Sequence, residues 1–237
     1  MKVRHLHDWQ ITPAEARRIQ TTLARQVSQV NEIKKACLVA GVDISVPKYS
    51  ALARAAIVAM TYPGFEVVET QIAEGELFFP YIPGLLSFRE APLILTACQK
   101  LSTNPNLIMV DGQGISHPRH FGLASHLGLL LNTPTIGCAK SRLCGSHDPP
   151  PYEAGTYSEL TDNDNIIGAV LRTKRGTKPI YVSIGHKIDL PTAIYWTMEC
   201  CRGYRLPELT RLAHLIAGGK HFTSAQITSR RNTGSPL

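Results

Sequence analysis

The feature that most constrains the fold is a four-residue apolar run, Leu107–Val110, which ends at an aspartate followed by a glycine. An apolar run of this length is typical of a strand that is buried on both faces of a sheet. Asp111 would then stand where a central strand ends, and a carboxylate there stays ionised only beside a cation or a hydrogen-bond donor. The alternative is an aspartate that starts an ordinary turn with Gly112.

Length and composition limit the class of protein. The chain has 237 residues, of which 43% are hydrophobic, and this is enough for one large domain with a substantial core. We expect a single catalytic domain over residues 1–237, with a mobile tail from about residue 220. No apolar run approaches the roughly 18 residues of a membrane span, and the N-terminus lacks the apolar stretch of a signal peptide. We therefore expect a cytoplasmic, monomeric protein with no membrane partner.

The charge of the chain favours a polyanionic partner. Lysine and arginine outnumber aspartate and glutamate by 25 to 18, which gives a net charge of +7. Basic residues cluster at positions 172–175 and 202–205. Such an excess becomes informative beside an acidic site, where positive surface would hold a phosphate backbone against metal-binding carboxylates.

The six cysteines do not indicate a metal or redox site. No two of them have a C-x-x-C spacing, which structural zinc sites and dithiol redox sites commonly use. None has a base adjacent in sequence that would activate it as a nucleophile. We expect reduced cysteines that serve in packing.

The spacing of apolar residues predicts an α/β fold. Helices are expected over residues 13–35, 87–101, 121–131, 191–202 and 207–217, and strands over 36–46, 51–62, 65–79, 107–110 and 135–140. The first three strands follow one another and predict an antiparallel meander, with Pro63 and Gly64 as the turn. The later alternation of helix and strand implies parallel pairing. After a loop over 145–165, a hairpin is expected from residues 166–172 and 180–184.

Three carboxylates occupy informative positions, namely Asp43 inside the first strand, Glu90 in the first turn of a helix, and Asp111. Each also has an ordinary explanation, because Glu90 could complete a capping box with Ser87 and Asp43 could mark a strand end or a bulge. If the first and fourth strands are neighbours, Asp43 and Asp111 lie side by side and need a cation between them. Mg²⁺ takes oxygen ligands and keeps waters, so the pair favours phosphodiester hydrolysis with one or two metals.

Other residues could complete such a site. His117, Lys140 at the end of a strand and His214 on the last helix could supply positive charge or protons. A structural role for each histidine and ordinary surface charge for Lys140 are the alternatives. Gly84, Gly112, Gly114 and Gly137 could line a slot for a flipped base, or could serve only as turn residues.

The segment Pro80, Tyr81, Ile82 and Pro83 is the other unusual stretch. Two prolines stiffen a Tyr–Ile pair, so an exposed aromatic ring could be presented at a low cost in ordering entropy. Such a ring could insert between bases as a wedge, and we call residues 80–83 the wedge segment. The alternative is a tyrosine buried in a turn between a strand and a helix.

Residues 80–90 (PYIPGLLSFRE), 110–119 (VDGQGISHPR) and 135–140 (TIGCAK) together closely resemble endonuclease V, and the resemblance extends from Gly41-Val42-Asp43 to residues 203–208. It implies a ribonuclease H-like fold, with a mixed five-stranded central sheet flanked by helices and an extra C-terminal hairpin and helices. It also implies a Mg²⁺-dependent endonuclease, with Mn²⁺ as a substitute, that recognises deaminated bases in DNA, chiefly deoxyinosine. The implied cut is at the second phosphodiester bond on the 3′ side of the lesion, leaving 3′-hydroxyl and 5′-phosphate ends.

The resemblance also implies roles at the matching positions. Asp43, Glu90 and Asp111 would hold metal, Tyr81 of the wedge segment would part the strands, His117, Lys140 and His214 would assist at the scissile phosphate, and Leu86, Gly112, Gly114 and Leu143 would form the base pocket. Cys138 and His120 occupy positions where the family commonly has an aliphatic residue and an arginine. Two alternatives stay open: a ribonuclease H-like nuclease that prefers inosine-containing RNA or branched DNA, and a non-catalytic, structure-specific nucleic-acid binder.

Overall fold

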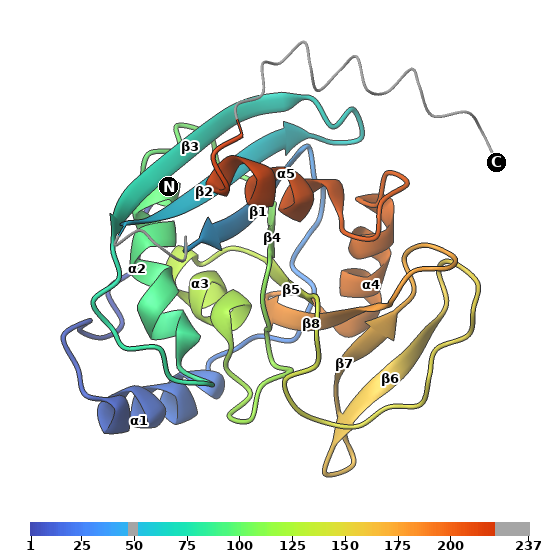
Figure 1. Cartoon of the computed structure of the whole chain (residues 1–237), viewed down its shortest axis with the longest axis horizontal. Helices are drawn as coiled ribbons and strands as arrows, with labels where there is room; N and C mark the ends of the chain where they lie inside the picture. The colour runs from blue at the N-terminus through green and yellow to red at the C-terminus, as the bar shows by residue number, and fades with distance from the viewer. Residues whose placement is uncertain (47–51, 221–237) are drawn as a thin grey trace.

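The computed structural model of the protein describes residues 1–46 and 52–220. Within these residues eight strands form one sheet in the order β3-β2-β1-β4-β5-β8-β7-β6 (Figure 1). The strands are β1 (Leu38–Ser45), β2 (Leu52–Thr61), β3 (Val67–Glu76), β4 (Leu107–Val110), β5 (Thr135–Ala139), β6 (Tyr157–Asp162), β7 (Asn165–Leu171) and β8 (Ile180–His186). The helices are α1 (Pro13–Ala24), α2 (Leu86–Gln99), α3 (Leu123–Leu131), α4 (Leu190–Glu199) and α5 (Glu208–Ala217).

The strand pairing confirms the predicted α/β, ribonuclease H-like class. β1, β2 and β3 form the antiparallel meander, and β4 pairs parallel with both β1 and β5. Parallel strands run in the same direction, so the C-terminal ends of β1, β4 and β5 lie together along one edge of the sheet. This edge is the place where the predicted carboxylates and Lys140 come together.

The prediction of a five-stranded sheet with a separate hairpin is wrong. β8 pairs antiparallel with β5, so the hairpin of β7 and β8 continues the central sheet. β6, which lies inside the predicted loop over 145–165, pairs with β7 and forms the edge. Only Leu160 of β6 is buried, so this strand lacks the apolar alternation that would mark it in the sequence.

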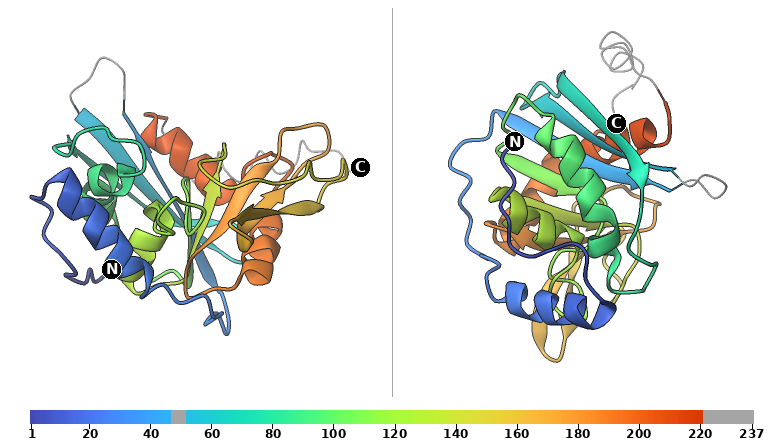
Figure 2. Two further views of the ribbon diagram at one scale, coloured as in Figure 1. Left: turned by 90° about the horizontal axis from the view of Figure 1, so that it is seen from below. Right: turned by 90° about the vertical axis from the view of Figure 1, so that its left-hand side faces the viewer.

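Helices cover both faces of the sheet and create two cores. Ala56, Val58 and Met60 of β2 face a cluster that includes α4 and α5, whereas the alternate residues Ile57 and Ala59 face a cluster that includes α2 and α3. The views of Figure 2 show α2 and α3 on one side of the sheet and α5 on the other. Burial on both faces explains why the central strands have continuous apolar sequences.

α1 is shorter than predicted and does not pack across the sheet. It ends at Ala24 rather than near residue 35, and Val30 beyond it is 69% exposed. Ala16 packs against Phe79, Leu85 and Phe88 beneath the wedge segment. The helix therefore supports the loop before α2.

Two further predictions have different outcomes. The six cysteines are free, but the expected packing role is wrong for Cys37, which is exposed. The predicted mobile tail, residues 221–237, and Ala51, the predicted start of the second strand, lie outside the described residues. Among the helices that are described, none combines the length and the hydropathy needed to span a bilayer.

Candidate functional site

Asp43 and Asp111 lie side by side at the sheet edge, as the sequence predicts. Val42 pairs with Val110 in the parallel register of β1 and β4, and the backbone N–H of Asp111 donates to the carbonyl oxygen of Val42 at 3.2 Å. Asp43 is 7% exposed, and the Asp111 side chain is 12% exposed. Two carboxylates are thus held close together and mostly out of water.

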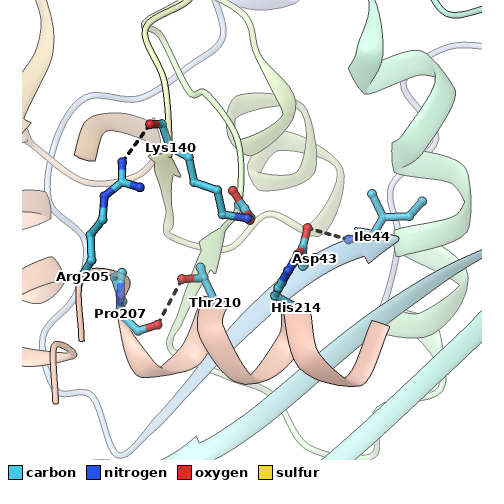
Figure 3. Close-up of polar contacts among 8 residues, drawn as sticks. Asp43, Ile44, Lys140, Arg205, Pro207, Thr210 and His214 are labelled. Carbon is cyan, nitrogen blue, oxygen red and sulfur yellow. Dashed lines mark hydrogen bonds and ion pairs between the residues drawn. The ribbon is translucent and has the colours of Figure 1, made fainter. Parts of the chain in front are cut away.

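Three neighbouring groups bind these carboxylates. His214 of α5 lies 2.6 Å from Oδ2 of Asp43 through its Nδ1, and the backbone N–H of Ile44 donates to Oδ1 at 2.8 Å (Figure 3). Lys140, directly after β5, contacts Oδ2 of Asp111 with its ammonium group. One ligand atom from each of Asp43, Asp111 and His214 lies within 4.8 Å of the others, so the three could hold a metal ion. Glu90, predicted as a third metal ligand, does not belong to this group.

Glu90 nevertheless faces the same site. The predicted capping box is wrong, because α2 begins one residue earlier than expected, with Leu85 at the N-cap position and no side-chain cap. Ser87 lies inside the helix, where its hydroxyl does not bond to Glu90. Glu90 instead lines a cavity together with Asp43 and Asp111.

The electrostatics of the three carboxylates fit a hard divalent cation. The pKa of Asp43 is raised to about 6, chiefly by burial and then by the Asp111 carboxylate, while the bond to His214 opposes this rise. Burial also raises the pKa of Glu90 to about 7, with Asp43 as the next contributor and Arg89 opposing. Carboxylates with raised pKa values repel one another when they ionise, and a bound cation offsets this repulsion. Mg²⁺ and Mn²⁺ are cations that prefer oxygen ligands.

We predict that a divalent cation stabilises the protein more at pH 8 than at pH 6. The raised pKa values mean that Asp43 and Glu90 favour the folded state at low pH, and that this contribution is lost as the pH rises through about 6 and 7. A bound cation compensates the ionised pair, so its effect grows with pH. The measurement is the shift in melting temperature caused by saturating Mg²⁺ at each pH. A shift that is equal at both values contradicts the prediction, and Glu90→Gln should flatten the dependence.

A cavity of about 420 Å³ adjoins the carboxylates, within the range of small-molecule sites. The loop before α2, the loop after β4 and the residues after β5 form its walls. The predicted residues that line it are Asp43, Tyr81, Pro83, Gly84, Leu86, Glu90, Asp111, Gly112, His117, Lys140 and Leu143. The structure therefore joins the predicted metal ligands, base pocket and wedge segment in one place.

The wedge segment presents its aromatic ring to solvent. Tyr81 is 70% exposed, so the alternative of a buried tyrosine is wrong. Pro80 and Pro83 are exposed on either side of the pair, and Ile82 packs against the cluster of Ala16 and its neighbours. The segment thus exposes the Tyr81 ring, while Ile82 next to it is packed against the core.

Gly114 does not line the cavity. Its backbone N–H donates to Ser183 Oγ at 2.9 Å, and a Cβ at this position would lie 2.0 Å from the carbonyl oxygen of Ile184 in β8. Gly114 is therefore required for close packing against β8, and its assignment to the base pocket stays a prediction. A Cβ on Gly112, by contrast, would lie 3.4 Å from Leu123, an ordinary contact at the cavity wall.

His117 is bonded on both ring nitrogens, which argues against the predicted role at the phosphate. Its Nδ1 accepts from the backbone N–H of Arg119 at 3.1 Å, so Nε2 carries the proton and donates to the carbonyl oxygen of Gly84 at 3.0 Å. Burial lowers the pKa of His117 to about 4. The ring is neutral, and both of its nitrogens are occupied by hydrogen bonds to the backbone.

Two polar residues line the cavity although the sequence did not predict them as site residues. Ser87 Oγ and Gln113 Oε1 are buried without a hydrogen-bond partner among the described residues, and both residues line the cavity. Gln113 Nε2 donates to the carbonyl oxygen of Ser141 at 2.9 Å, which fixes the orientation of the amide. Buried polar atoms of this kind suggest a polar ligand. The position of Gln113 between two glycines is the only sequence signal for it.

Gly41 allows α5 to bring His214 to Asp43. A Cβ on Gly41 would lie 2.2 Å from the carbonyl oxygen of Leu209, so the first turn of α5 rests directly on β1. We predict that Gly41→Ala lowers the unfolding free energy by about 1–3 kcal/mol, because overpacking displaces backbone. Chemical denaturation measures this change. Gly75→Ala in β3 is the control, since its Cβ would meet only Leu93 Cδ1, at 3.2 Å, and an equal loss in both variants contradicts the account.

Comparisons with known proteins all indicate one family. The family model described as endonuclease V matches residues 21–215. An endonuclease V from Dehalococcoides mccartyi is 51% identical over 217 residues, which cover 92% of this chain and 97% of the relative. The crystal structure of endonuclease V from Streptomyces avermitilis superposes with a TM-score of 0.84 at 39% identity, covering 92% of this chain and 96% of that one.

A further solved structure contains a nucleic acid. Endonuclease V from Ciona intestinalis, in complex with a 24mer DNA that contains an inosine followed by a ribo-adenosine, has a TM-score of 0.74 at 28% identity. The aligned region covers 86% of this chain and 95% of that one. The family model spans most of the chain and the relatives match along nearly their whole length. The chain therefore belongs to the endonuclease V family of nucleases.

Proposed function

We propose that the protein is a Mg²⁺-dependent endonuclease that nicks DNA beside deaminated bases, chiefly deoxyinosine. The observation that carries this proposal is the pair Asp43 and Asp111 with His214, beside a cavity that also borders the exposed Tyr81. Membership of the endonuclease V family supports the nuclease activity. The inosine-containing DNA bound by the Ciona relative supports the substrate.

The residues of the site would have different roles in the reaction. Asp43 and Asp111 would hold the cation, with Glu90 and His214 as further candidates. The cation would stabilise charge on the phosphate and lower the pKa of bound water. His214 orients the Asp43 carboxylate through their 2.6 Å contact. Lys140, beside Asp111, would compensate the negative charge of the phosphate.

The cavity is suited to an extruded base. Hypoxanthine carries a hydrogen on N1, for which the unpaired Oε1 of Gln113 is an acceptor. Adenine has no hydrogen on N1 and would leave this buried oxygen unpaired, which is costly. The carboxylates line one part of this cavity, so a base bound in the remaining part would place them beside a neighbouring phosphate. We infer, as the family resemblance implies, a cut at the second phosphodiester bond on the 3′ side that leaves 3′-hydroxyl and 5′-phosphate ends.

Two basic loops support a phosphate backbone as partner. Lys174 Nζ donates to the carbonyl oxygen of Gly203 at 2.9 Å, which joins the loop after β7 to the loop after α4. Arg205, in the second loop, donates to the carbonyl oxygen of Lys140 at 2.9 Å (Figure 3). Exposed lysine and arginine side chains thus lie next to the catalytic edge, where they would neutralise the flanking strand.

We predict that the double substitution Lys174→Gln and Arg175→Gln weakens duplex binding and reduces its salt dependence. The slope of log K against log salt concentration is negative, and each lost phosphate contact reduces its magnitude by about 0.9. Fluorescence anisotropy at several salt concentrations, with Ca²⁺ in place of Mg²⁺, measures the slope. The exposed pair Lys34→Gln and Lys35→Gln, which precedes β1, is the matched control. Equal slopes for both double variants contradict this use of the loops.

The proposed function is tested with an end-labelled duplex that contains one deoxyinosine. With Mg²⁺ we expect one nick at the second phosphodiester bond 3′ to the inosine, and no nick in the adenine duplex or with a chelator. Inosine-containing RNA and a branched DNA are run in parallel. Faster cleavage of either would favour the corresponding alternative nuclease. Binding of these substrates without any metal-dependent cleavage would favour a non-catalytic binder.

A further inference from the structure

Three side-chain donors converge on a single backbone oxygen directly after the wedge segment. The carbonyl oxygen of Gly84 accepts from Gln20 Nε2 at 3.0 Å, His117 Nε2 at 3.0 Å and Arg119 Nη2 at 2.7 Å. Gln20 is completely buried and His117 is 3% exposed. A carbonyl oxygen has two lone pairs, so three donors on one oxygen form an unusually dense contact.

The donors are also bonded to one another and to the core. Arg119 Nε donates to Gln20 Oε1 at 2.5 Å, and Gln20 Nε2 also donates to the carbonyl oxygen of Phe121 at 3.0 Å. His117 Nδ1 accepts from the backbone of Arg119. The contacts link α1, the loop after β4 and the loop before α2 into one network.

The network fixes the backbone at the point where the wedge segment returns to the core. Gly84 has a φ of +78°, a conformation that favours glycine, and a Cβ there would lie 2.8 Å from Arg119 Nη2. The backbone N–H of Leu85 donates to the carbonyl oxygen of Ile82 at 2.9 Å and closes the turn. Moving the backbone that carries the Tyr81 ring would therefore require breaking several partly buried hydrogen bonds.

We propose that Gln20, Arg119 and His117 are positioning residues that hold the wedge segment rigid, so that Tyr81 parts the strands of a duplex beside the lesion. The inference rests on the proposed function and deepens it. If the wedge segment moved on contact with a stacked duplex, Tyr81 would lose the position needed to separate the bases. A displacement of about 1 Å can lower the rate of an enzymatic reaction a hundredfold.

Gln20→Met tests the proposal, because methionine keeps the length of the side chain and removes its donors. Arg119→Met removes the second donor, and Arg119→Lys keeps one donor as the conservative variant. Gln26→Met, an exposed glutamine just after α1, is the matched control. Each variant is assayed on an inosine duplex and on the same inosine strand within an unpaired bubble. Thermal melting confirms folding.

A second readout does not depend on cleavage. The fluorescence of 2-aminopurine next to the inosine rises when the neighbouring bases unstack, and it is measured on the intact duplex with Ca²⁺. We expect Gln20→Met and Arg119→Met to lower this rise and to slow duplex cleavage roughly ten- to hundredfold, with bubble cleavage within about threefold of the unsubstituted protein. Arg119→Lys should recover part of the loss.

The outcomes separate the inference from the proposed function. Equal losses on duplex and bubble, or an unchanged 2-aminopurine signal in both methionine variants, would overturn the positioning role. If Arg119→Met raises KM equally on the duplex and on the bubble, Arg119 binds phosphate directly and the positioning role is overturned. Failure of the unsubstituted protein to nick inosine DNA would reject the proposed function, while the fluorescence signal still reports on the wedge.

Discussion

Replacing Asp111 with asparagine is expected to lower Mg²⁺-dependent nicking of an inosine duplex at least about a thousandfold. The substitution removes a negative charge next to Asp43 and leaves a neutral amide oxygen where a charged oxygen ligand is required. A bound metal contributes several kcal/mol to stabilising the transition state, and about 1.4 kcal/mol corresponds to a factor of ten in rate. Single-turnover kinetics on an end-labelled duplex measure the effect.

Loss of folding does not account for this expected result. Asparagine has nearly the same shape as aspartate, and removing the charge relieves the repulsion that raises the pKa of Asp43. We therefore expect the melting temperature of Asp111→Asn without metal to stay within a few degrees of that of the unsubstituted protein. Asp164→Asn, in the exposed turn between β6 and β7, is the matched control and should nick normally. Full activity of Asp111→Asn would remove Asp111 from the site.

Tyr81→Ala is expected to slow cleavage of an inosine duplex by roughly five- to a hundredfold. Stacking of a base on an aromatic side chain contributes about 1–3 kcal/mol, and the 70% exposed ring is available for it. An inosine within an unpaired bubble needs no strand separation, so its cleavage should change little. Comparing single-turnover rates on the two substrates isolates the wedge.

Ring chemistry gives the controls for this prediction. Tyr81→Phe keeps the stacking surface and should retain most of the duplex activity. Tyr157→Ala removes another half-exposed tyrosine, on the edge strand β6, and should have no effect. An equal loss on duplex and bubble would place Tyr81 in the cavity as a base contact rather than between the strands.

The central part of the fold and the pairing of Asp43 with Asp111 could be predicted from the sequence. Short apolar runs that end in carboxylates mark buried parallel strands, and the order of the elements limits their neighbours to a few arrangements. The same information could not identify β6. Only Leu160 of that strand is buried, so pairing with β7 rather than its own sequence determines its conformation.

The contacts of the site were less predictable, because they join residues far apart in the chain. His214 reaches Asp43 across 171 positions, and although the sequence offered this histidine as a candidate, it did not predict the contact. Gln20 has the sequence signature of a polar residue on an amphipathic helix, yet it bonds to Arg119 across 99 positions. His117 lies in the cavity as predicted, but the partners on its two nitrogens determine its role, and these depend on tertiary structure.

Whether Asp43 and Asp111 share a metal ion is tested most directly by the position of a bound metal in crystals of the protein soaked with Mn²⁺. We predict an anomalous difference peak about 2.2 Å from carboxylate oxygens of both Asp43 and Asp111, the distance at which such cations bind oxygen. The peak should be absent in Asp111→Asn crystals treated in the same way. The absence of a peak between these carboxylates, in a protein that nicks inosine DNA with Mn²⁺, would show that Asp43 and Asp111 do not hold the metal.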